Sequence, residues 1–266
     1  MVQAAFRLEG LTSGYEKVTV FEDLHTSIAE GKITTIIGPN GCGKSTLLKT
    51  IGRILQQQKG KVFIQDQDMQ HISTKEIAKR MAILSQTPIA PAQLKVGELI
   101  SYGRYPHRKN VNRLSKKDTE VIEWAMKVTN TTEYQHRELD QLSGGQRQRV
   151  WLAMALVQET DILLLDEPTT YLDMAHQMEV LEIVKDLNNK HQCTVVMVLH
   201  DINHAARFSH ELIAMRDGRI VKSGTAQEIL TKEVMRDVFQ VEARIMEDPV
   251  SKTPVCFGYD ITKGLG

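Results

Sequence analysis

The stretch that decides the fold lies at residues 38–46 and reads Gly38-Pro39-Asn40-Gly41-Cys42-Gly43-Lys44-Ser45-Thr46. It fits the pattern G-x-x-x-x-G-K-[ST], in which glycines let successive backbone N–H groups surround the phosphates of a nucleotide. An apolar run precedes it, and a helical pattern follows from Lys44 to about Leu55, so the positive end of a helix dipole is expected at the phosphates. The pattern predicts that Lys44 reaches the β- and γ-phosphate oxygens and that the Ser45 hydroxyl binds Mg²⁺.

An acidic pair follows a second apolar run, where Ile162-Leu163-Leu164-Leu165 leads into Asp166-Glu167. A strand that ends in aspartate places the carboxylate at the carboxyl edge of a sheet, which is where phosphate loops also lie. Asp166 is therefore a candidate Mg²⁺ ligand, and Glu167 a candidate base or positioning group for an attacking water molecule. Taken alone, a buried strand with a solvated acidic end explains this pattern equally well.

The segments around these motifs alternate between strand-like and helix-like patterns. Strands are expected at 33–37, 61–64, 81–84, 162–165 and 194–199, and helices at 97–104, 115–128, 144–157, 174–187 and 202–208. Asp217-Gly218 between two apolar runs is a strong hairpin signal. Continuous apolar strands that alternate with helices predict an α/β fold with a mainly parallel sheet, joined by an antiparallel N-terminal β region and an inserted helical subdomain.

A third motif, Leu142-Ser143-Gly144-Gly145-Gln146, has the chemistry of another phosphate cradle. It offers a serine hydroxyl, two glycines and an expected helix N-terminus at Gly144. One chain with one nucleotide has no need of two cradles. We therefore expect the second cradle to serve the nucleotide of a neighbouring copy.

With these three motifs the chain resembles the ATP-binding subunits of ABC transporters across nearly its whole length. The resemblance implies ATP and Mg²⁺ as cofactors, with Ser45, Gln86 and Asp166 on the metal. It implies that Tyr15 stacks on adenine beside Val20, and that Asp173 in Tyr171-Leu172-Asp173 belongs to the dimer seam. The groups that act in hydrolysis are then Glu167, His200, Gln86 and Lys44.

The resemblance also implies partners. Two copies sandwich two ATP molecules, each between the loop 38–46 of one copy and Ser143, Gly144, Gly145, Gln146 and Asp173 of the other. The pair drives integral-membrane permease subunits from the cytoplasmic face of the membrane, peripherally, and an extracytoplasmic substrate-binding protein acts indirectly. The expected domains are an ATPase domain at 1–240, with the helical subdomain at about 90–158, and a short extension at 241–266.

Two segments narrow the resemblance to the iron-chelate and cobalamin importer branch, and most closely to ferric-hydroxamate importer ATPases of Gram-positive bacteria. They are Gly97–His107 and Glu167–Gln177. The implied cargo is an iron(III) siderophore, with haem or cobalamin as the alternative. A soluble ATPase of the same family that acts on nucleic acid or ribosomes is a further alternative, although the single cassette without a coiled-coil insertion disfavours it.

Composition agrees with these expectations. The 33 basic side chains balance 33 acidic ones, so no overall field attracts nucleic acid. Three widely spaced cysteines suit a reducing compartment, and we expect neither a secretory signal nor a membrane span. One stretch of the chain, at residues 104–117, is rich in basic side chains. We expect it to be a solvated face or a contact with permease or lipid headgroups; it comprises Arg104, Arg108, Lys109, Arg113, Lys116 and Lys117.

Overall fold

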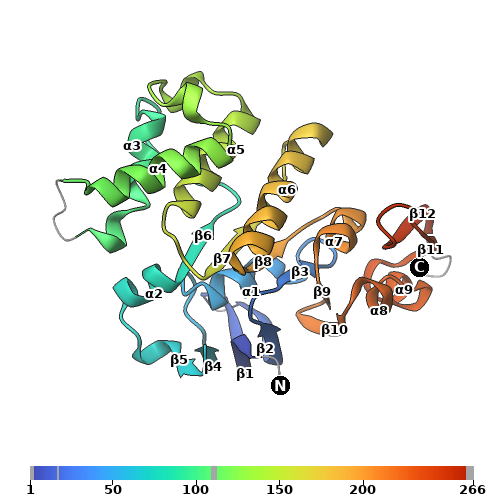
Figure 1. The fold of residues 1–266 in the computed structure, drawn as a ribbon. Helices are drawn as coiled ribbons and strands as arrows, with labels where there is room; N and C mark the ends of the chain where they lie inside the picture. The colour runs from blue at the N-terminus through green and yellow to red at the C-terminus, as the bar shows by residue number, and fades with distance from the viewer. Residues whose placement is uncertain (1–2, 17, 109–112, 262–266) are drawn as a thin grey trace. The chain divides into compact units, whose positions relative to one another are not determined.

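The computed structural model describes residues 3–16, 18–108 and 113–261 (Figure 1). Its internal contacts divide the chain into two compact units. The first unit combines Met1–His71 with Thr194–Gly266, and the second unit is Ile72–Cys193. Each unit is described by itself below.

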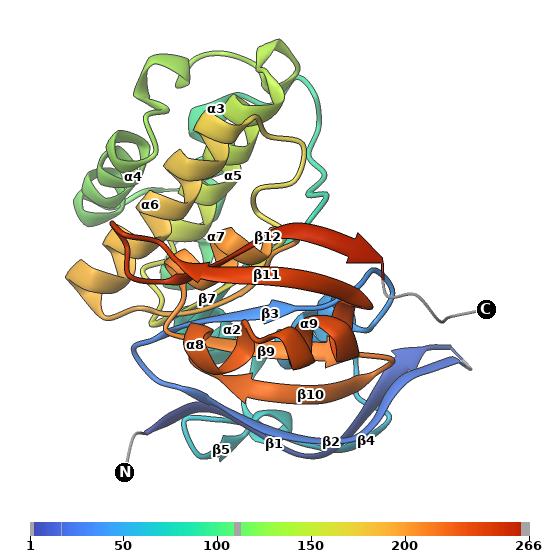
Figure 2. The same cartoon turned by 90° about the vertical axis from the view of Figure 1, so that its right-hand side faces the viewer.

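Two sheets form the first unit. The antiparallel sheet has the order β2-β1-β4-β5, with β1 at Ala4–Tyr15, β2 at Val18–Ala29, β4 at Lys59–Ile64 and β5 at Gln67–Asp68. In the other sheet, β3 (Ile33–Ile37) pairs in parallel with β8 (Thr194–Val198) and β9 (Glu211–Arg216), and β10 (Arg219–Gly224) runs antiparallel to β9. Figure 2 shows β3, β9 and β10 side by side. Every residue of β3 is buried, as expected for a central strand covered on both faces.

The helices of the first unit are short. They are α1 (Lys44–Ile51), α7 (Ile202–Phe208), α8 (Ala226–Ile229) and α9 (Lys232–Phe239), with a 3₁₀ turn η1 at Met69–His71. The prediction that the helix after the phosphate loop reaches Leu55 is wrong. Gly52 caps α1, and Arg53 follows with a left-handed φ of 57°, which ends the helical conformation.

A C-terminal hairpin, β11 (Val241–Glu247) and β12 (Pro254–Ile261), packs against α7 and α9. The Asn203 side chain of α7 joins it to the unit, because its amide nitrogen donates to the Cys256 carbonyl at 3.1 Å and its oxygen accepts from the Cys256 N–H at 2.8 Å. The sequence indicated only a short extension here, so this hairpin is an addition to the predicted fold.

The second unit contains one parallel strand pair and a set of helices. Strand β6 (Met81–Leu84) pairs in parallel with β7 (Ile162–Asp166), from Met81 opposite Ile162 to Leu84 opposite Leu165. The α-helices are α2 (Thr74–Arg80), α3 (Val96–Tyr102), α4 (Lys116–Val128), α5 (Gly144–Leu156) and α6 (Met174–His191). Short 3₁₀ turns connect them at Tyr105–His107 (η2), Thr132–Tyr134 (η3) and Leu139–Gln141 (η4). Helices α3, α4 and α5 contact one another, as Figure 1 shows in green.

Capping residues explain where the long helices begin. Ser115 and Ser143 each form a capping box at the start of α4 and α5, and Asp173 accepts from the His176 N–H at the start of α6. The predicted α/β class, with parallel strand pairs and an antiparallel N-terminal region, is confirmed. The domain boundaries at 90–158 and 241–266 stay predictions. Among the described residues, no helix combines the length and apolar character that crossing a membrane requires.

Candidate nucleotide-binding site

The phosphate loop joins β3 to α1 in the first unit, in the strand–loop–helix order that the sequence predicts. Lys44 lies in the first turn of α1 and is only 5% exposed. Its ammonium donates to the carbonyl oxygens of Gly38 and Pro39, each at 2.9 Å. The Lys44 side chain therefore folds back over its own loop, and in this position its ammonium could also bind a phosphate oxygen.

Glycine is required at the ends of this loop. Gly38 has a φ of 152°, and a Cβ atom added to it would lie 2.1 Å from the Met215 carbonyl oxygen. Gly43 precedes α1 with a φ of 106°, in the region that only glycine adopts without strain. At Gly41 an added Cβ would meet no atom within 4 Å, so the middle of the loop faces open space.

The β9–β10 turn packs against the phosphate loop, which the sequence analysis did not foresee. Asp217 and Gly218 have φ values of 48° and 73°, as a two-residue type I′ hairpin requires. The Gly218 N–H donates to the Cys42 carbonyl at 3.1 Å. The Asp-Gly pair signalled the hairpin, but nothing in the sequence indicated that this hairpin holds the loop.

Val20 and His200 both lie near the phosphate loop. The Val20 side chain is 3.1 Å from the position of a Cβ on Gly43. Strands β3 and β8 align Ile36 with Val198, so the loop and His200 leave the same edge of the sheet. Tyr15 ends β1 opposite Val18 and is 45% exposed. The structure thus gathers Val20, His200 and the loop in the first unit.

In the second unit, the register of a parallel strand pair likewise brings Gln86 and Glu167 together. Because Leu84 and Leu165 are partners in the parallel pair β6–β7, the residues two positions after each of them, Gln86 and Glu167, leave the same edge. The Gln86 amide nitrogen donates to Glu167 Oε2 at 2.5 Å. Asp166, one residue earlier, is 1% exposed at the end of β7.

The backbone and one hydroxyl fix the Glu167 carboxylate. Glu167 has a φ of 53°, which turns the chain sharply after β7. Thr170 Oγ1 donates to Glu167 Oε2 at 3.0 Å, and Gln148 Nε2 of α5 donates to the Pro168 carbonyl at 3.0 Å. Thr170 and Gln148 were not among the predicted site residues, since neither belongs to a motif with its own chemistry.

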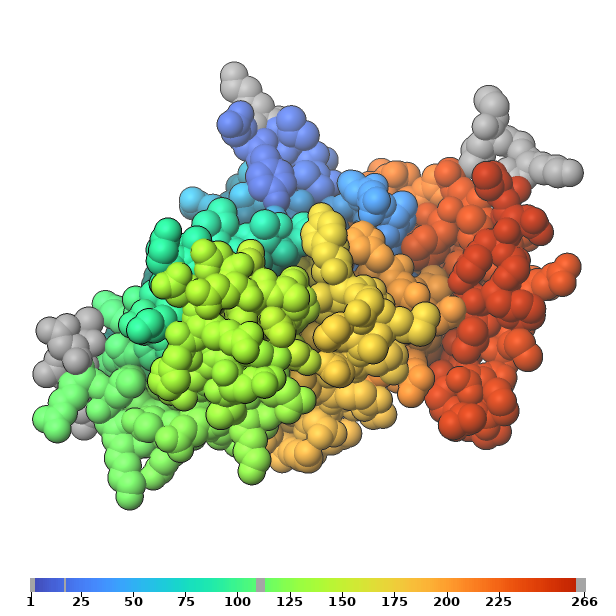
Figure 3. Space-filling model, turned by 90° about the horizontal axis from the view of Figure 1, so that it is seen from above, coloured from blue at the N-terminus to red at the C-terminus, as the bar shows by residue number. Residues whose placement is uncertain are grey.

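Ser143 and Gln146 satisfy each other's backbone at the start of α5. The Ser143 N–H donates to Gln146 Oε1 at 2.9 Å, and the Gln146 N–H donates to Ser143 Oγ at 3.3 Å. Ser143 and Gly144 are exposed. Figure 3 shows the yellow-green segment around residues 125–150 at the surface of the second unit. The expected helix N-terminus at Gly144 is confirmed, and its first turn faces solvent.

Asp173 connects this region to α6. Its Oδ1 accepts from the N–H of His176 at 2.9 Å and from the His176 ring at 2.7 Å. The backbone hydrogen bond from His176 is the largest cause of a lowered pKa for Asp173. The His176 ring in turn lies 3.3 Å from the position of a Cβ on Gly145. Tyr171, two residues before Asp173, is 91% exposed with a φ of 64°.

Cys42 lies in the phosphate loop at a helix N-terminus, so the sequence predicts a thiol with a lowered pKa, with shielding of the thiol by the loop as the alternative. The predicted lowering of the pKa is wrong. Cys42 is buried, and this burial raises the pKa of its thiol above the usual 9.0, although the charge of Lys44 acts in the opposite direction. Desolvation of the thiolate therefore outweighs both the nearby lysine and the helix end.

The basic run is also not a uniform solvated face. Arg104 is 2% exposed and forms ion pairs at 2.8 Å with both Asp118 and Glu159, while Lys117 lies 3.5 Å from Glu159. The sequence could not show this pairing, because Asp118 and Glu159 lie 14 and 55 residues after Arg104. Lys109 lies outside the described residues.

The donors present fit ATP and Mg²⁺. The loop offers backbone N–H groups, open space at Gly41 and a buried lysine, which suit a polyphosphate. Ser45 offers a hydroxyl in the first turn of α1, Asp166 a carboxylate and Gln86 an amide oxygen. Oxygen ligands of this kind are what Mg²⁺ prefers.

Sequence comparison finds relatives that match along nearly the whole of both chains. The chain is 53% identical over 255 residues to the iron(3+)-hydroxamate import ATP-binding protein FhuC of Bacillus subtilis, covering 96% of this chain and 95% of that protein. It is 45% identical over 257 residues to the ferric enterobactin transport ATP-binding protein FepC of Escherichia coli, covering 96% and 95%.

Solved structures agree. The dimeric structure of MJ0796, a bacterial ABC transporter cassette, matches with a TM-score of 0.75 and 28% identity over 83% of this chain and 98% of that one. An inward-facing ABC transporter assigned to the metal-chelate type matches with a TM-score of 0.81 and 28% identity over 97% of each chain. The profile of the family named ABC transporter matches residues 21–170. With the phosphate loop, the acidic strand end and the second cradle each in place, the chain belongs to the ABC transporter ATP-binding family.

Proposed function

We propose that this protein is the ATP-hydrolysing subunit of an importer for iron(III) siderophores, with a hydroxamate as the favoured cargo. The observation that carries the mechanism is the 2.5 Å hydrogen bond between Gln86 and Glu167. It joins the proposed base of hydrolysis to the loop that leads toward the proposed permease groove. The cargo class rests on the relatives that import siderophores, among which the hydroxamate importer ATPase shares 53% of its residues.

Bound Mg²⁺ would offset the charge of the triphosphate during attack by water. In the proposed site, Lys44 and the loop N–H groups hold the phosphates, and Ser45, Gln86 and Asp166 hold the ion. Glu167 accepts the proton of the attacking water, oriented by Thr170 and Gln86. His200 contacts the γ-phosphate, while Tyr15 stacks on adenine beside Val20.

A second copy of the chain completes the proposed site. Its Ser143, Gly144, Gly145, Gln146 and Asp173 approach the nucleotide of the first copy. This role is supported by the solvent-facing start of α5, which offers the hydroxyl and the backbone of a helix N-terminus. The contact between His176 and Gly145 would keep the two trans segments in one arrangement.

The permease is proposed to dock in a groove of about 230 Å³ in the second unit, which begins two residues after Gln86. It is lined by Pro88, Ile89, Ala90, Ala92, Leu139, Asp140, Arg147 and Trp151. Ile89 is 90% exposed, an unusual position for a large apolar side chain that a partner helix would cover. Movement of that helix would reach Glu167 through Gln86.

This assembly is proposed to work at the cytoplasmic face of the membrane, fed by an extracytoplasmic binding protein. Haem and cobalamin stay as alternative cargoes, because the described groups contact nucleotide and permease and never the cargo. The balanced charge gives no support to nucleic acid as a partner.

Uptake of labelled ferric hydroxamate tests the proposal. Deletion of the gene is expected to reduce uptake at least tenfold, with rescue by the wild type and by Glu182→Gln, an exposed carboxylate of α6, but not by Glu167→Gln. Unchanged uptake in a deletion strain that encodes no second ATPase of this branch would refute the cargo. Rescue by Glu167→Gln would refute the hydrolytic role.

A further inference from the structure

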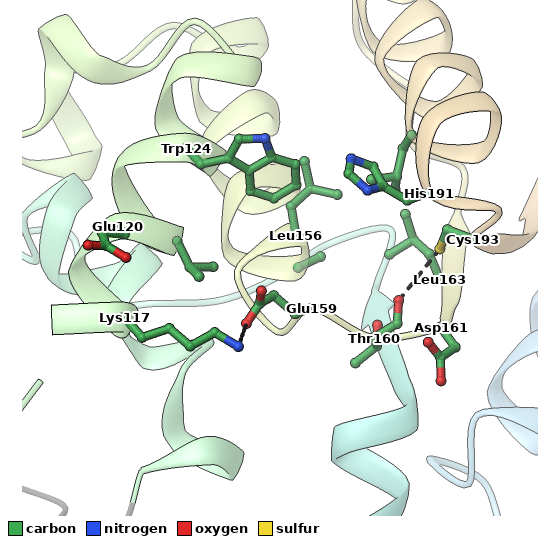
Figure 4. A pocket seen from close by; sticks show the side chains of 13 residues that line it. Lys117, Glu120, Trp124, Leu156, Glu159, Thr160, Asp161, Leu163, His191 and Cys193 are labelled. Atoms are coloured by element: carbon green, nitrogen blue, oxygen red, sulfur yellow. Dashed lines mark hydrogen bonds and ion pairs between the residues drawn. The ribbon is translucent and has the colours of Figure 1, made fainter. Parts of the chain in front are cut away.

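A pocket of about 380 Å³ lies in the second unit, away from the residues assigned above (Figure 4). One face of α4, the last turns of α5 and α6, and the start of β7 line it. Its apolar lining consists of Val121, Trp124, Ala155, Leu156, Leu163 and Leu187. This volume and this mainly apolar lining are typical of small-molecule sites, which span about 300–1,000 Å³.

The pocket has an aromatic side and an acidic side. Figure 4 shows Trp124 and His191 together on one side, and their ring centroids lie 5.8 Å apart with an interplanar angle of 84°. On the other side lie Glu159, with Lys117 beside it, and Asp161. A ligand that spans the pocket would therefore meet flat apolar surface at one end and carboxylates at the other.

One carboxylate on the acidic side is already neutralised. Glu159 Oε2 lies 2.8 Å from Arg104 Nη1 and 3.5 Å from Lys117 Nζ. Arg104 also pairs with Asp118 at 2.8 Å. These two basic and two acidic side chains balance, so this network offers no net charge to a ligand.

Asp161 and Glu120 give the lining its net negative charge. Asp161 is exposed at the rim and makes no ion pair with any described residue. The thiol of Cys193, which lines the pocket, has a pKa raised to about 12; burial is the larger cause and the negative charge of Asp161 is the second. The charge of Asp161 therefore acts on the pocket wall. Among the residues that the structure describes, Glu120 pairs with Lys116 at 3.9 Å, and both of those side chains are well solvated.

We propose that this pocket binds a small organic cation, namely a protonated amine carried on a flat apolar ring. The ring would pack between Trp124 and the aliphatic lining, where aromatic side chains contribute most to binding. The ammonium would lie against Asp161, and Glu120, which Figure 4 shows on the opposite side of the view near Trp124, would add a weaker attraction over a longer distance.

Three elements connect this pocket to the residues of the proposed site, so the inference that occupancy influences ATP rests on the proposed function. Helix α5 begins at Gly144 and ends at the pocket, α6 begins after Asp173 and ends there, and β7 passes the pocket at Leu163 before it reaches Asp166. At 1.5 Å per residue, α5 spans about 20 Å. We infer that these packed elements couple the pocket to the proposed site, and the titration with nucleotide described below tests that coupling.

Calorimetric titration of nucleotide-free, full-length protein at pH 7 tests the binding site. The probes are phenethylamine, the neutral 2-phenylethanol and the anionic phenylacetate. We expect phenethylamine to bind at least tenfold more tightly than the other two. Asp161→Asn should weaken the amine about tenfold, Glu120→Gln about threefold, and Trp124→Leu should weaken both the amine and the alcohol. The control, Glu123→Gln, changes an α4 carboxylate outside the pocket and should change nothing.

Equal affinity for the amine and the alcohol, or an Asp161→Asn protein that binds the amine like the wild type, would overturn the proposal. Thermal unfolding monitored by circular dichroism verifies that each variant is folded. Asp161 and Glu120 are exposed, so their loss of charge should leave the fold intact.

The same titration with Mg-ATP, in the Glu167→Gln protein to prevent turnover, tests the coupling. Coupling between two sites is reciprocal, so if the amine changes the affinity for ATP, then ATP must change the affinity for the amine by the same factor. We expect the amine affinity to change at least fivefold. An unchanged amine affinity in protein that binds ATP would refute the coupling. Absence of ATP binding would refute the proposed function instead, and the two failures are therefore distinguishable.

Discussion

Lys44 and Cys42 are two residues apart in the phosphate loop, and burial acts differently on each. Lys44 keeps two carbonyl partners for its ammonium, so its charge stays satisfied inside the loop. Cys42 instead becomes a poorer acid, since its thiolate would be desolvated. The loop therefore retains one charge for the phosphates and shields one thiol from solvent.

Lys44→Ala should remove ATP hydrolysis, with a loss of at least a hundredfold, because the β- and γ-phosphate charge loses its cationic partner. A steady-state ATPase assay measures this loss, and Lys127→Ala, at an exposed lysine of α4, serves as the control. ATP hydrolysis near the wild-type rate in folded Lys44→Ala protein would contradict the assignment of the loop.

Cys42 should react slowly with maleimide at pH 7. Even at the ordinary pKa of 9.0 only about 1% of the thiol is ionised, and burial raises the pKa further. In a Cys193→Ala, Cys256→Ala background, labelling of native protein should be at least tenfold slower than labelling in urea, and it should accelerate as pH rises above 9. A native rate equal to that of the unfolded chain would disprove the shielding.

The sequence alone could predict site residues whose partners lie close to them along the chain, and it could not predict residues whose partners are distant in the chain. Lys44, Ser143 and Asp173 were predicted as site residues because each belongs to a short motif, and their roles stay predictions. The direction of the Cys42 pKa shift was predicted wrongly because the surroundings of Cys42 include the β9–β10 turn, about 175 residues away. Thr170 and Gln148 were missed because only the folded chain brings them to the Glu167 turn.

Among the elements, α4 depends on one buried carboxylate. Although burial acts to raise it, hydrogen bonds from Ser115 and Arg104 lower the pKa of Asp118 to about 2. Asp118 thus completes the capping box of α4 and neutralises Arg104, which also donates to the Val157 carbonyl after α5. Asp118 and Arg104 together join the start of α4 to the end of α5.

Asp118→Asn should lower the free energy of unfolding by about 3 kcal/mol at pH 7, since it leaves a buried guanidinium partly uncompensated. The folded pKa lies below the ordinary 3.8, so the wild-type advantage is complete above that value and disappears as pH falls through about 2. Urea unfolding at pH 7, 4 and 2.5 measures the difference between the two proteins. A difference independent of pH would contradict the ionic origin, and Glu123→Gln should show almost no loss.

Caps explain why the starts of three long or central helices were predicted correctly, although the capped short helices α2, α8 and α9 were not predicted. Predicted α5, α6 and α7 agree with the structure at their starts, where Ser143, Asp173 and Asp201 accept from the backbone. The β11–β12 hairpin was missed although β11 begins with alternating apolar and charged residues, because the alternation is short and few residues of either strand are buried. The fold class followed from the apolar strands, which need no partner information.

At the scale of the whole molecule, the two cradles imply that the functional assembly contains two chains. Glu167→Gln should bind ATP, stall hydrolysis and accumulate as a dimer, because the amide keeps the shape of the carboxylate and loses its basicity. Size-exclusion chromatography with and without ATP measures this. A variant that stays monomeric at high protein and ATP concentrations would contradict the sandwich, and Glu182→Gln should behave as the wild type.

The capping box at Ser143 determines whether α5 must lose its N-terminal hydrogen bond when the proposed second cradle binds a phosphate. A hydroxyl has two lone pairs and one proton, and the cap occupies a single lone pair, through the Gln146 N–H. The proton and the other lone pair stay available, so Ser143 can donate to a phosphate oxygen while it still caps α5. In the proposed dimer, α5 would therefore keep its N-terminal cap while a phosphate is bound, and the Ser143 side chain would need no rearrangement to donate.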